Sequence, residues 1–126
     1  ARLHFDATQS TYQKRLIFGG HIISVCRALS YEGLENALTI AAINGGSHCN
    51  PTFAGDTIYA HSQVLDKWQL PNREDVGALR LRLLGVKNER LQDASMAMRE
   101  ENGKRIYQPN VVLDLDYTVL MPRKTK

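Results

Sequence analysis

The sequence predicts an α+β domain in which an antiparallel sheet is wrapped around one long central helix. Three observations support this fold class. An apolar stretch of helical character at residues 21–29 precedes four stretches of strand character, and no internal repeat interrupts this order. Apolar residues cover most of the circumference of that helix, which favours burial on several sides. One small sheet around one helix leaves an open edge, which predicts pairing with a second copy or a sister domain.

The size and composition are those of one globular domain. The chain has 126 residues, of which 43% are hydrophobic and 23% are charged, so disordered, collagen-like and coiled-coil proteins are excluded. No apolar run approaches the ~18–20 residues that cross a bilayer. Two cysteines are too few for a disulfide-stapled secreted scaffold. These features predict a cytoplasmic protein that does not act on a membrane.

The charge pattern gives little support to nucleic-acid binding. Sixteen Lys and Arg residues against thirteen Asp and Glu residues give a net charge of +3, and part of this excess lies in the last residues. There is no basic stripe interleaved with aromatic residues, no zinc-finger spacing and no RNP-type motif. Neither CxxC nor HExxH occurs, so no metal site is predicted. P-loop, GxGxxG and GxSxG motifs are also absent.

Two helices are expected in the first quarter of the chain. Asp6 is a good N-cap for a short helix over residues 7–12. The second helix begins near His21, directly after Gly19-Gly20, and Gly33 supplies its C-terminal stop.

Four strands follow, separated by turn signals. They are expected at residues 38–43, 57–65, 79–83 and 111–120. The first strand ends in Asn44-Gly45-Gly46, which is typical of a turn or a bulge, and residues 70–75 predict a turn. The Leu-Arg alternation of residues 79–83 indicates a strand with one solvated face. The polar stretch 88–103 is interpreted as a loop.

Gly19-Gly20 is the first feature with a chemical use. Two glycines at a helix N-terminus let a ligand approach unpaired backbone N–H groups, which the helix dipole supports. Such donors stabilise an oxyanion. A turn that needs positive φ explains the two glycines equally well.

The four histidines are weaker candidates, because a lone histidine is more often structural than catalytic. His61 lies in the middle of a predicted strand, and His48 lies in a loop beside a strand end, where it could bind a ligand. His21 opens the helix. His4 precedes a helix cap, in a segment with no structural reason to prefer histidine.

Cysteines and carboxylates add no catalytic pattern. Cys26 falls in the buried pattern of the helix, and Cys49 has no partner at a metal-binding spacing. The pair Glu100-Glu101 and the alternating Asp114 and Asp116 are interpreted as solvated faces.

Taken together, these residues resemble the MaoC-like, or (R)-specific enoyl-CoA hydratase, branch of the hot-dog fold. The resemblance spans essentially the whole chain and is carried by residues 4–6, 12–21 and 51–57, where Gly55-Asp56-Thr57 opens a strand. A closer similarity is to family members that convert mesaconyl-CoA to β-methylmalyl-CoA and carry two hot-dog halves in one chain. The segments that carry this closer similarity are residues 16–24, 27–30, 40–46, 53–57, 75–83, 112–117 and 119–123.

The resemblance implies that residues 1–126 form a single hot-dog domain, the C-terminal half of a longer chain, and the start at Ala1 without Met agrees with this. It implies reversible hydration of an enoyl-CoA thioester, with CoA as part of the substrate and no separate cofactor. His4 matches the catalytic histidine, although the usual preceding Asn and Pro are absent, and its polar partner would lie about five residues earlier. The Gly20 N–H would polarise the thioester carbonyl.

Further residues are candidates for ligand contacts. The candidate substrate-binding residues are Gly19, His21, Asn44 and His48, and the candidates for the CoA phosphates are Arg80, Arg82 and Lys87. The expected partners are an acyl-CoA substrate and a sister hot-dog domain, either in the same chain or in a second subunit of a homo-oligomer.

Two alternative functions remain open. The chain could be a non-catalytic hot-dog half that completes the acyl-CoA tunnel of a sister domain, although the retained His4 argues against this. An acyl-CoA thioesterase would place a carboxylate on or next to the central helix. Glu32 is the carboxylate nearest to that helix, and it sits at the far end.

Overall fold

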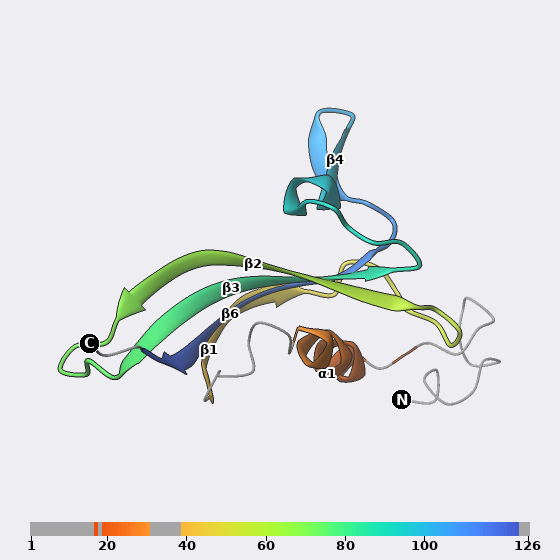
Figure 1. Ribbon diagram of the computed structural model, residues 1–126. Coiled ribbons are helices and arrows are strands. Elements are labelled where there is room, and N and C mark those ends of the chain that lie inside the picture. The colour runs from red at the N-terminus through yellow and green to blue at the C-terminus, as the bar shows by residue number, and fades with distance from the viewer. Residues whose placement is uncertain (1–16, 18, 31–38, 124–126) are drawn as a thin grey trace.

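The structure, a computed structural model, describes residues 17, 19–30 and 39–123. The helix predicted after Asp6 and the stop at Gly33 lie outside these residues. The described elements, in chain order, are α1 (Gly19–Leu29), β1 (Thr39–Ser47), β2 (Ile58–Gln69), β3 (Val76–Lys87), the short 3-10 helix η3 (Ala94–Ala97), β4 (Met98–Glu101), β5 (Lys104–Tyr107) and β6 (Val111–Pro122) (Figure 1).

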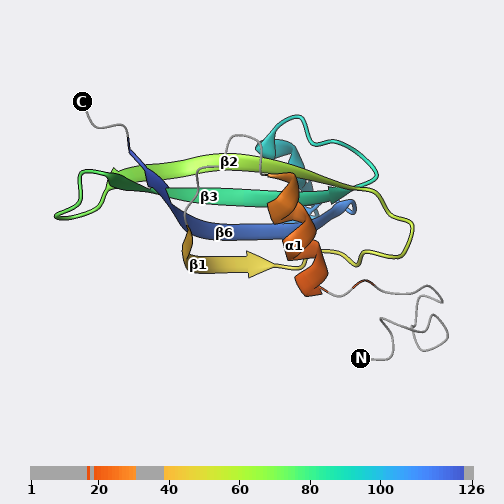
Figure 2. The same cartoon turned by 60° about the horizontal axis from the view of Figure 1, so that its bottom comes forward.

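Four of the strands form one antiparallel sheet in the order β1-β6-β3-β2. The last strand, β6, therefore lies in the interior of the sheet between β1 and β3. Helix α1 lies across the concave face of this sheet (Figures 1 and 2). An antiparallel sheet over one helix is thus confirmed, but the helix has 11 residues and is shorter than the long central helix that the sequence predicts.

The main core lies between α1 and the two interior strands. Alternate residues of β3 and β6 face the helix, because side chains along a strand point to opposite faces in turn. The core residues on these strands are Leu81, Leu83, Val112, Leu113, Leu115, Tyr117 and Val119, and they pack with Ile22 and Cys26 of the helix. Full burial of one such side chain contributes about 1.5–3 kcal/mol, so this layer holds the helix on the sheet.

Strand β1 follows the prediction in its irregularity but not in its length. Its pairing with β6 shifts register between Ile40 and Ala42 and again between Ile43 and Gly45, so the predicted bulge is confirmed. The strand nevertheless continues through the glycines to Ser47. A Cβ atom on Gly46 would lie 3.0 Å from Leu115 Cδ1 and 3.2 Å from the Asp114 carbonyl oxygen, so glycine allows this close approach to β6.

The stretch 88–103, predicted as a loop, is instead partly ordered into η3 and β4. Strand β4 pairs with β5 in a hairpin that projects from one end of the sheet (Figure 1). Asn102 and Gly103 both have positive φ, 54° and 78°, as a tight Asn-Gly hairpin turn requires. The hairpin strands are mostly polar, so the sequence lacks the alternation of apolar and polar residues that would predict them as strands. Ala94 and Ala97 are buried in a second core on the convex face, with Leu84, Val86 and Val111.

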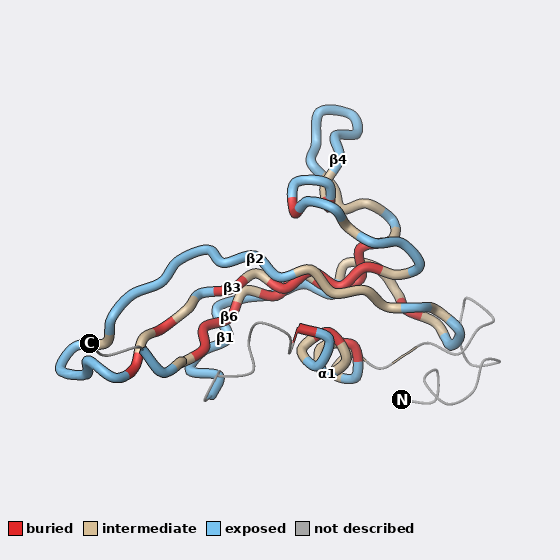
Figure 3. The backbone as a smooth tube through the Cα atoms, viewed as in Figure 1, coloured by how far each residue is buried: buried red, intermediate tan, exposed pale blue. Residues whose placement is uncertain are grey.

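Helix α1 is buried along one face, not on several sides as its composition predicts. Ile22 and Cys26 are its buried residues, and Leu29 is 52% exposed. Figure 3 shows buried and exposed segments alternating around the helix. Among the described residues, the sheet alone covers the helix. Leu29, on a face of the helix turned away from the sheet core, stays exposed.

Both edges of the sheet carry exposed apolar side chains. Ile40 and Ile43 on β1 are 46% and 65% exposed, and Val64 and Trp68 on β2 are 58% and 43% exposed (Figure 3). Edge strands with free backbone groups and apolar side chains are surfaces on which another chain or segment can pair.

The absence of a side chain at Gly85 allows α1 to lie close to β3. A substitution at this position tests this packing. A Cβ atom there would lie 2.7 Å from Cys26 Sγ and 3.1 Å from Leu113 Cβ. We expect Gly85→Ala to lower the free energy of unfolding of the intact polypeptide by about 1–3 kcal/mol, as over-packing in a core does. Urea unfolding curves measure this. Gly45→Ala is the control, because nothing lies within 4 Å of its added Cβ, and equal losses in the two variants would refute the close contact.

Candidate functional site

The candidate site is built around the first turn of α1. The helix begins at Gly19, two residues before the predicted start, so both glycines belong to its first turn. The first N–H groups of a helix have no acceptor within the helix, and the helix dipole makes this end electropositive. At the other side of Gly20, the Ser24 hydroxyl donates to the Gly20 carbonyl oxygen at 3.0 Å. Gly20 is therefore placed with its N–H at the open end of the helix.

A histidine ring lies so close to Gly19 that a larger residue at this position would displace the ring. A Cβ atom on Gly19 would lie 2.9 Å from Cε1 and 3.0 Å from Nε2 of His48. The residue has helical conformation, so close approach, rather than positive φ, accounts for this glycine. Gly19 and His48 are thus brought together, as the sequence analysis required for two ligand-binding residues.

A cleft of about 280 Å³ opens between the helix start and the loop after β1. Hydrogen bonds hold this loop in place. The Asn50 amide donates to the carbonyl oxygens of Gln108 and Val111 at 3.1 and 2.7 Å, and the Ile17 N–H donates to the Thr52 carbonyl oxygen at 2.8 Å. The lining residues are Ile17, Gly19, Ile22, His48, Asn50, Pro51, Thr52 and Val112.

The other predicted site residues are distributed over the molecule. His21 is exposed on the first turn of α1, near the cleft. Asn44 lies on the convex face of the sheet, where its amide donates to Asp116 Oδ1 at 3.0 Å and to Thr118 Oγ1 at 3.1 Å. The structure therefore does not bring Asn44 together with Gly19 and His48. His4 lies outside the described residues.

Gly55-Asp56-Thr57 builds the entry into β2. The Asp56 carboxylate accepts the Phe53 N–H at 2.8 Å and the Asn88 amide at 3.1 Å. Gly55 has φ of 97°, which glycine adopts without strain. The Thr57 N–H donates to Asn88 Oδ1 at 2.9 Å. The motif thus fixes a turn between the cleft loop and the start of β2.

Asp114 is part-buried and ion-paired, contrary to the sequence-based interpretation of a solvated face, whereas Asp116 belongs to a more exposed ion pair. Arg82 contacts both oxygens of Asp114, at 3.0 and 2.9 Å, and the Tyr107 hydroxyl donates to Asp114 Oδ2 at 2.6 Å. Arg80 pairs with Asp116 in the same way. The two arginines alternate with leucines along β3, and the two aspartates alternate with apolar residues along β6. The register of these strands therefore places the arginines beside the aspartates on one face of the sheet. Glu100 and Glu101 are exposed, as predicted.

The three basic residues considered for the CoA phosphates are already engaged. Arg80 and Arg82 hold the two aspartates, and Lys87 donates to the Pro51 carbonyl oxygen at 2.8 Å. The Lys87 ammonium also lies 5.3 Å from the centre of the Phe53 ring. The positive charge of these side chains therefore stabilises the sheet and the cleft loop.

Both cysteines are free thiols with little reactivity. Burial raises the pKa of Cys26 to about 11, and burial together with the negative charge of Asp114 raises the pKa of Cys49 to about 11. Thiolate is therefore scarce at neutral pH. Among the described residues, no group of three His, Cys, Asp or Glu side chains is arranged to hold a metal ion. No helix in this part of the chain is long and apolar enough to cross a bilayer.

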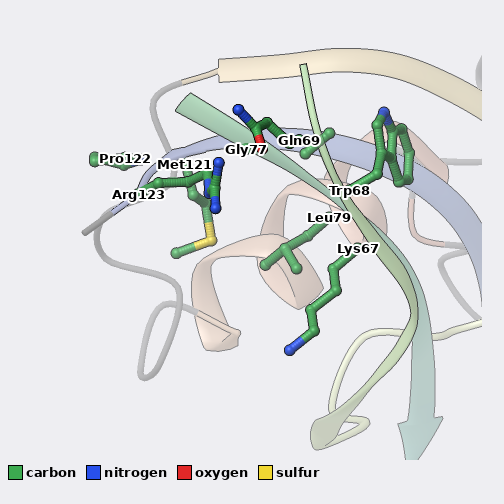
Figure 4. Close-up of a pocket in the computed structure, with 9 residues that line it drawn as sticks. Lys67, Trp68, Gln69, Gly77, Leu79, Met121, Pro122 and Arg123 are labelled. Atoms are coloured by element: carbon green, nitrogen blue, oxygen red, sulfur yellow. The ribbon is translucent and has the colours of Figure 1, made fainter. Parts of the chain in front are cut away.

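A second hollow of about 400 Å³ lies at the opposite end of β3 and β6 (Figure 4). Figure 4 shows Lys67 and Leu79 pointing to the helix side of the sheet. None of the predicted site residues lines this hollow. Its lining residues are Lys67, Trp68, Gln69, Gly77, Ala78, Leu79, Met121, Pro122 and Arg123.

Comparison with known proteins identifies two similar curated sequences. No family model matches the chain. A β-methylmalyl-CoA dehydratase of Chloroflexus aurantiacus is 51% identical over 127 residues, and a mesaconyl-CoA hydratase of Cereibacter sphaeroides is 51% identical over 123 residues. Each alignment covers 98% of this chain but 35% and 34% of the relative. The chain therefore spans about a third of the length of these relatives.

Solved structures agree with the sequence comparison. A crystal structure of a MaoC domain protein dehydratase from C. aurantiacus matches with a TM-score of 0.87 and 51% identity, over 99% of this chain and 35% of that one. A monoamine oxidase regulatory protein from Archaeoglobus fulgius matches with a TM-score of 0.71 over 99% of this chain and 74% of that one, and its 19% identity supports the fold alone. The predicted resemblance to MaoC-like proteins is confirmed.

The part-buried Asp114 gives the structure a pH dependence that can be measured. Burial by itself raises the pKa of Asp114, but hydrogen bonds from Arg82 and Tyr107 outweigh it and hold the pKa below its usual range. The unfolded chain, with an aspartate pKa of about 3.9, then binds the proton more readily than the folded chain. Asp114 therefore stabilises the fold above that pH, and this contribution is lost as the pH falls through the lowered folded value.

We expect Asp114→Asn to be less stable than the wild-type polypeptide at pH 7, with the difference narrowing below about pH 4. Urea unfolding between pH 3 and pH 7 measures both values. Glu100→Gln is the matched control on an exposed strand. A stability difference that stays constant across this pH range would count against the ionised pair.

Proposed function

We propose that this chain is part of a MaoC-like hydro-lyase that reversibly hydrates an enoyl-CoA thioester, with mesaconyl-CoA and β-methylmalyl-CoA as the substrate pair. The observation that carries the proposal is the 51% identity, over 98% of the chain, to two relatives named for the two directions of this reaction. Because the chain spans about a third of those relatives, the complete activity is proposed for a longer polypeptide that contains it.

The reaction requires three groups in one place. A base takes a proton from water as the water oxygen attacks the β-carbon, a donor stabilises the charge that develops on the thioester oxygen, and an acid returns a proton to the α-carbon. The N–H of Gly20 at the start of α1 suits the donor role. We propose His4, which lies outside the described residues, as the base, together with a polar partner that precedes Ala1.

The protons balance within this scheme. The proton that His4 and its partner take from water corresponds to the one delivered to the α-carbon, so the step consumes water and no oxidant or reductant. We therefore propose that the enzyme uses no separate cofactor and that CoA enters as part of the substrate. Gly19, His48 and His21 lie around or near the cleft at the helix start, which supports their role in contacting the substrate.

A sister hot-dog portion is proposed as the partner of this chain. The exposed apolar residues on the edge strands β1 and β2 support a second layer or strand at those edges. The relatives are about three times as long as this chain. We propose that the sister portion lies in the same polypeptide or in a second subunit, in a cytoplasmic enzyme that binds neither membranes nor nucleic acid.

The base is tested by His4→Ala in the intact polypeptide. We expect the rate of hydration of mesaconyl-CoA, followed as loss of enoyl-thioester absorbance, to fall by about 10²–10⁴-fold, because general acid–base groups contribute effects of this size. His61→Ala is the control, since His61 lies in the middle of β2. If His4→Ala keeps the wild-type rate, this chain is a non-catalytic half that completes the site of its sister.

The carbonyl donor is tested by Gly20→Pro, which removes one N–H from the first turn of a helix, where proline is tolerated. We expect kcat to fall by about 10²–10³-fold, the effect of losing one oxyanion donor. Gly20→Ala keeps the N–H and is the matched control. Equal losses of kcat in the two variants would assign the effect to the added side-chain atoms and would exclude a donor role for Gly20.

A further inference from the structure

Two polar atoms lie buried beneath the second half of α1 without a hydrogen-bond partner. They are Nε of Arg27 and the hydroxyl oxygen of Tyr117. Tyr117 is fully buried at the centre of β6. The guanidinium carbon of Arg27 lies 5.8 Å from the centre of the Tyr117 ring, so the two side chains pack together. Arg73, Arg80, Arg82 and Arg99 each pair with a carboxylate, whereas no carboxylate among the described residues pairs with Arg27.

Such an arrangement is costly unless a hydrogen-bond partner completes it. A buried donor without a partner costs about 1–3 kcal/mol, and more when the group is charged. The Arg27 Nε–H can only donate a hydrogen bond. The Tyr117 hydroxyl can accept one, and it can also donate one. Two donors on side chains that pack together, one of them cationic, match the two oxygens of a carboxylate. Charge-assisted hydrogen bonds of this kind are the strong ones.

The position of Arg27 relative to the helix start gives this pair a use. Arg27 follows Gly20 by seven residues, which is nearly two helical turns, so the two residues share one flank of α1. The axial distance between them is about 10 Å at a rise of ~1.5 Å per residue. Helical side chains lean toward the N-terminus, so the guanidinium reaches back toward Gly20. An extended four-carbon acyl group with a hydrogen bond at each end spans a distance of this order.

We propose that Arg27 and Tyr117 bind the distal carboxylate of a dicarboxylic acyl-CoA whose thioester carbonyl is held at Gly20. The inference rests on the proposed function and deepens it by assigning the residues that select the acyl group. An acyl group that ends in methyl would leave both donors buried and unpaired. A site built for hydrogen bonding rejects such an analogue strongly, because its polar groups are then left without partners.

Binding of saturated thioesters tests the subsite without chemistry. Succinyl-CoA and butyryl-CoA both carry four-carbon acyl groups and differ in a terminal carboxylate or methyl. We expect the wild-type intact polypeptide to bind succinyl-CoA at least tenfold more tightly by titration calorimetry, and Arg27→Gln to lose that preference while its affinity for butyryl-CoA stays within about twofold. Tyr117→Phe, which keeps the ring and removes the hydroxyl alone, should lose part of it.

The controls separate a binding role from a structural one. Arg105→Gln removes the same charge from the exposed hairpin strand β5 and should keep the full preference. If Arg27→Gln loses affinity for both thioesters equally, or if it still prefers succinyl-CoA tenfold, the subsite is refuted. The Tyr117→Phe variant keeps the test decisive if Arg27→Gln fails to fold.

Hydration assays on the same variants distinguish the two proposals. If the wild-type protein hydrates neither mesaconyl-CoA nor crotonyl-CoA while the succinyl-CoA preference depends on Arg27, the proposed function fails and the subsite stands. If the wild-type protein hydrates mesaconyl-CoA and Arg27→Gln keeps its preference, the function stands and the subsite is refuted.

Discussion

Cys26 of α1 meets Gly85 of β3 at a separation that a residue with a Cβ atom would not allow. This contact sets the height and rotation of the helix on the sheet, and the candidate site depends on both. With Cys26 and Ile22 turned into the core, Gly19 is brought against His48. The neighbouring flank of the helix carries Gly20 and Arg27, and the Arg27 guanidinium packs against the Tyr117 ring at the border of this core.

The convex face secures the strands that carry this core. Arg82, Asp114 and Tyr107 form a hydrogen-bonded group that links β3, β6 and β5. An exposed ion pair such as Arg80 with Asp116 contributes at most about 1 kcal/mol. The Arg82–Asp114 pair is less exposed and has a third partner, so it constrains the register of β3 on β6 more strongly. That register decides which leucines and which tyrosine face the helix.

Some of this arrangement can be predicted from the sequence, because local patterns determine it. The alternation of residues 79–83 and the helix start at Gly19-Gly20 are such patterns. Other features depend on pairing between distant segments. Two register shifts in β1 decide on which face Asn44 lies, and a single-residue slip reverses the faces of a strand. Asp114 appears solvated until its cross-strand arginine is known, and the hairpin of β4 and β5 shows itself only in its Asn-Gly turn.

The proposed selection of a dicarboxylic acyl group rests on penalties more than on attraction. Transferring a carboxylate from water into the apolar layer of Leu81, Val119 and Tyr117 is costly, and Arg27 offsets that cost without a large surplus. A methyl group at the same place avoids the desolvation of a charge but leaves the arginine and the phenol unpaired. In this proposal, discrimination arises because the unpaired donors keep their desolvation cost unless an anion accepts their hydrogen bonds. In the proposed complex the two ends of one helix contact the two ends of the substrate, so the length of the helix between Gly20 and Arg27 also limits the length of the acyl group.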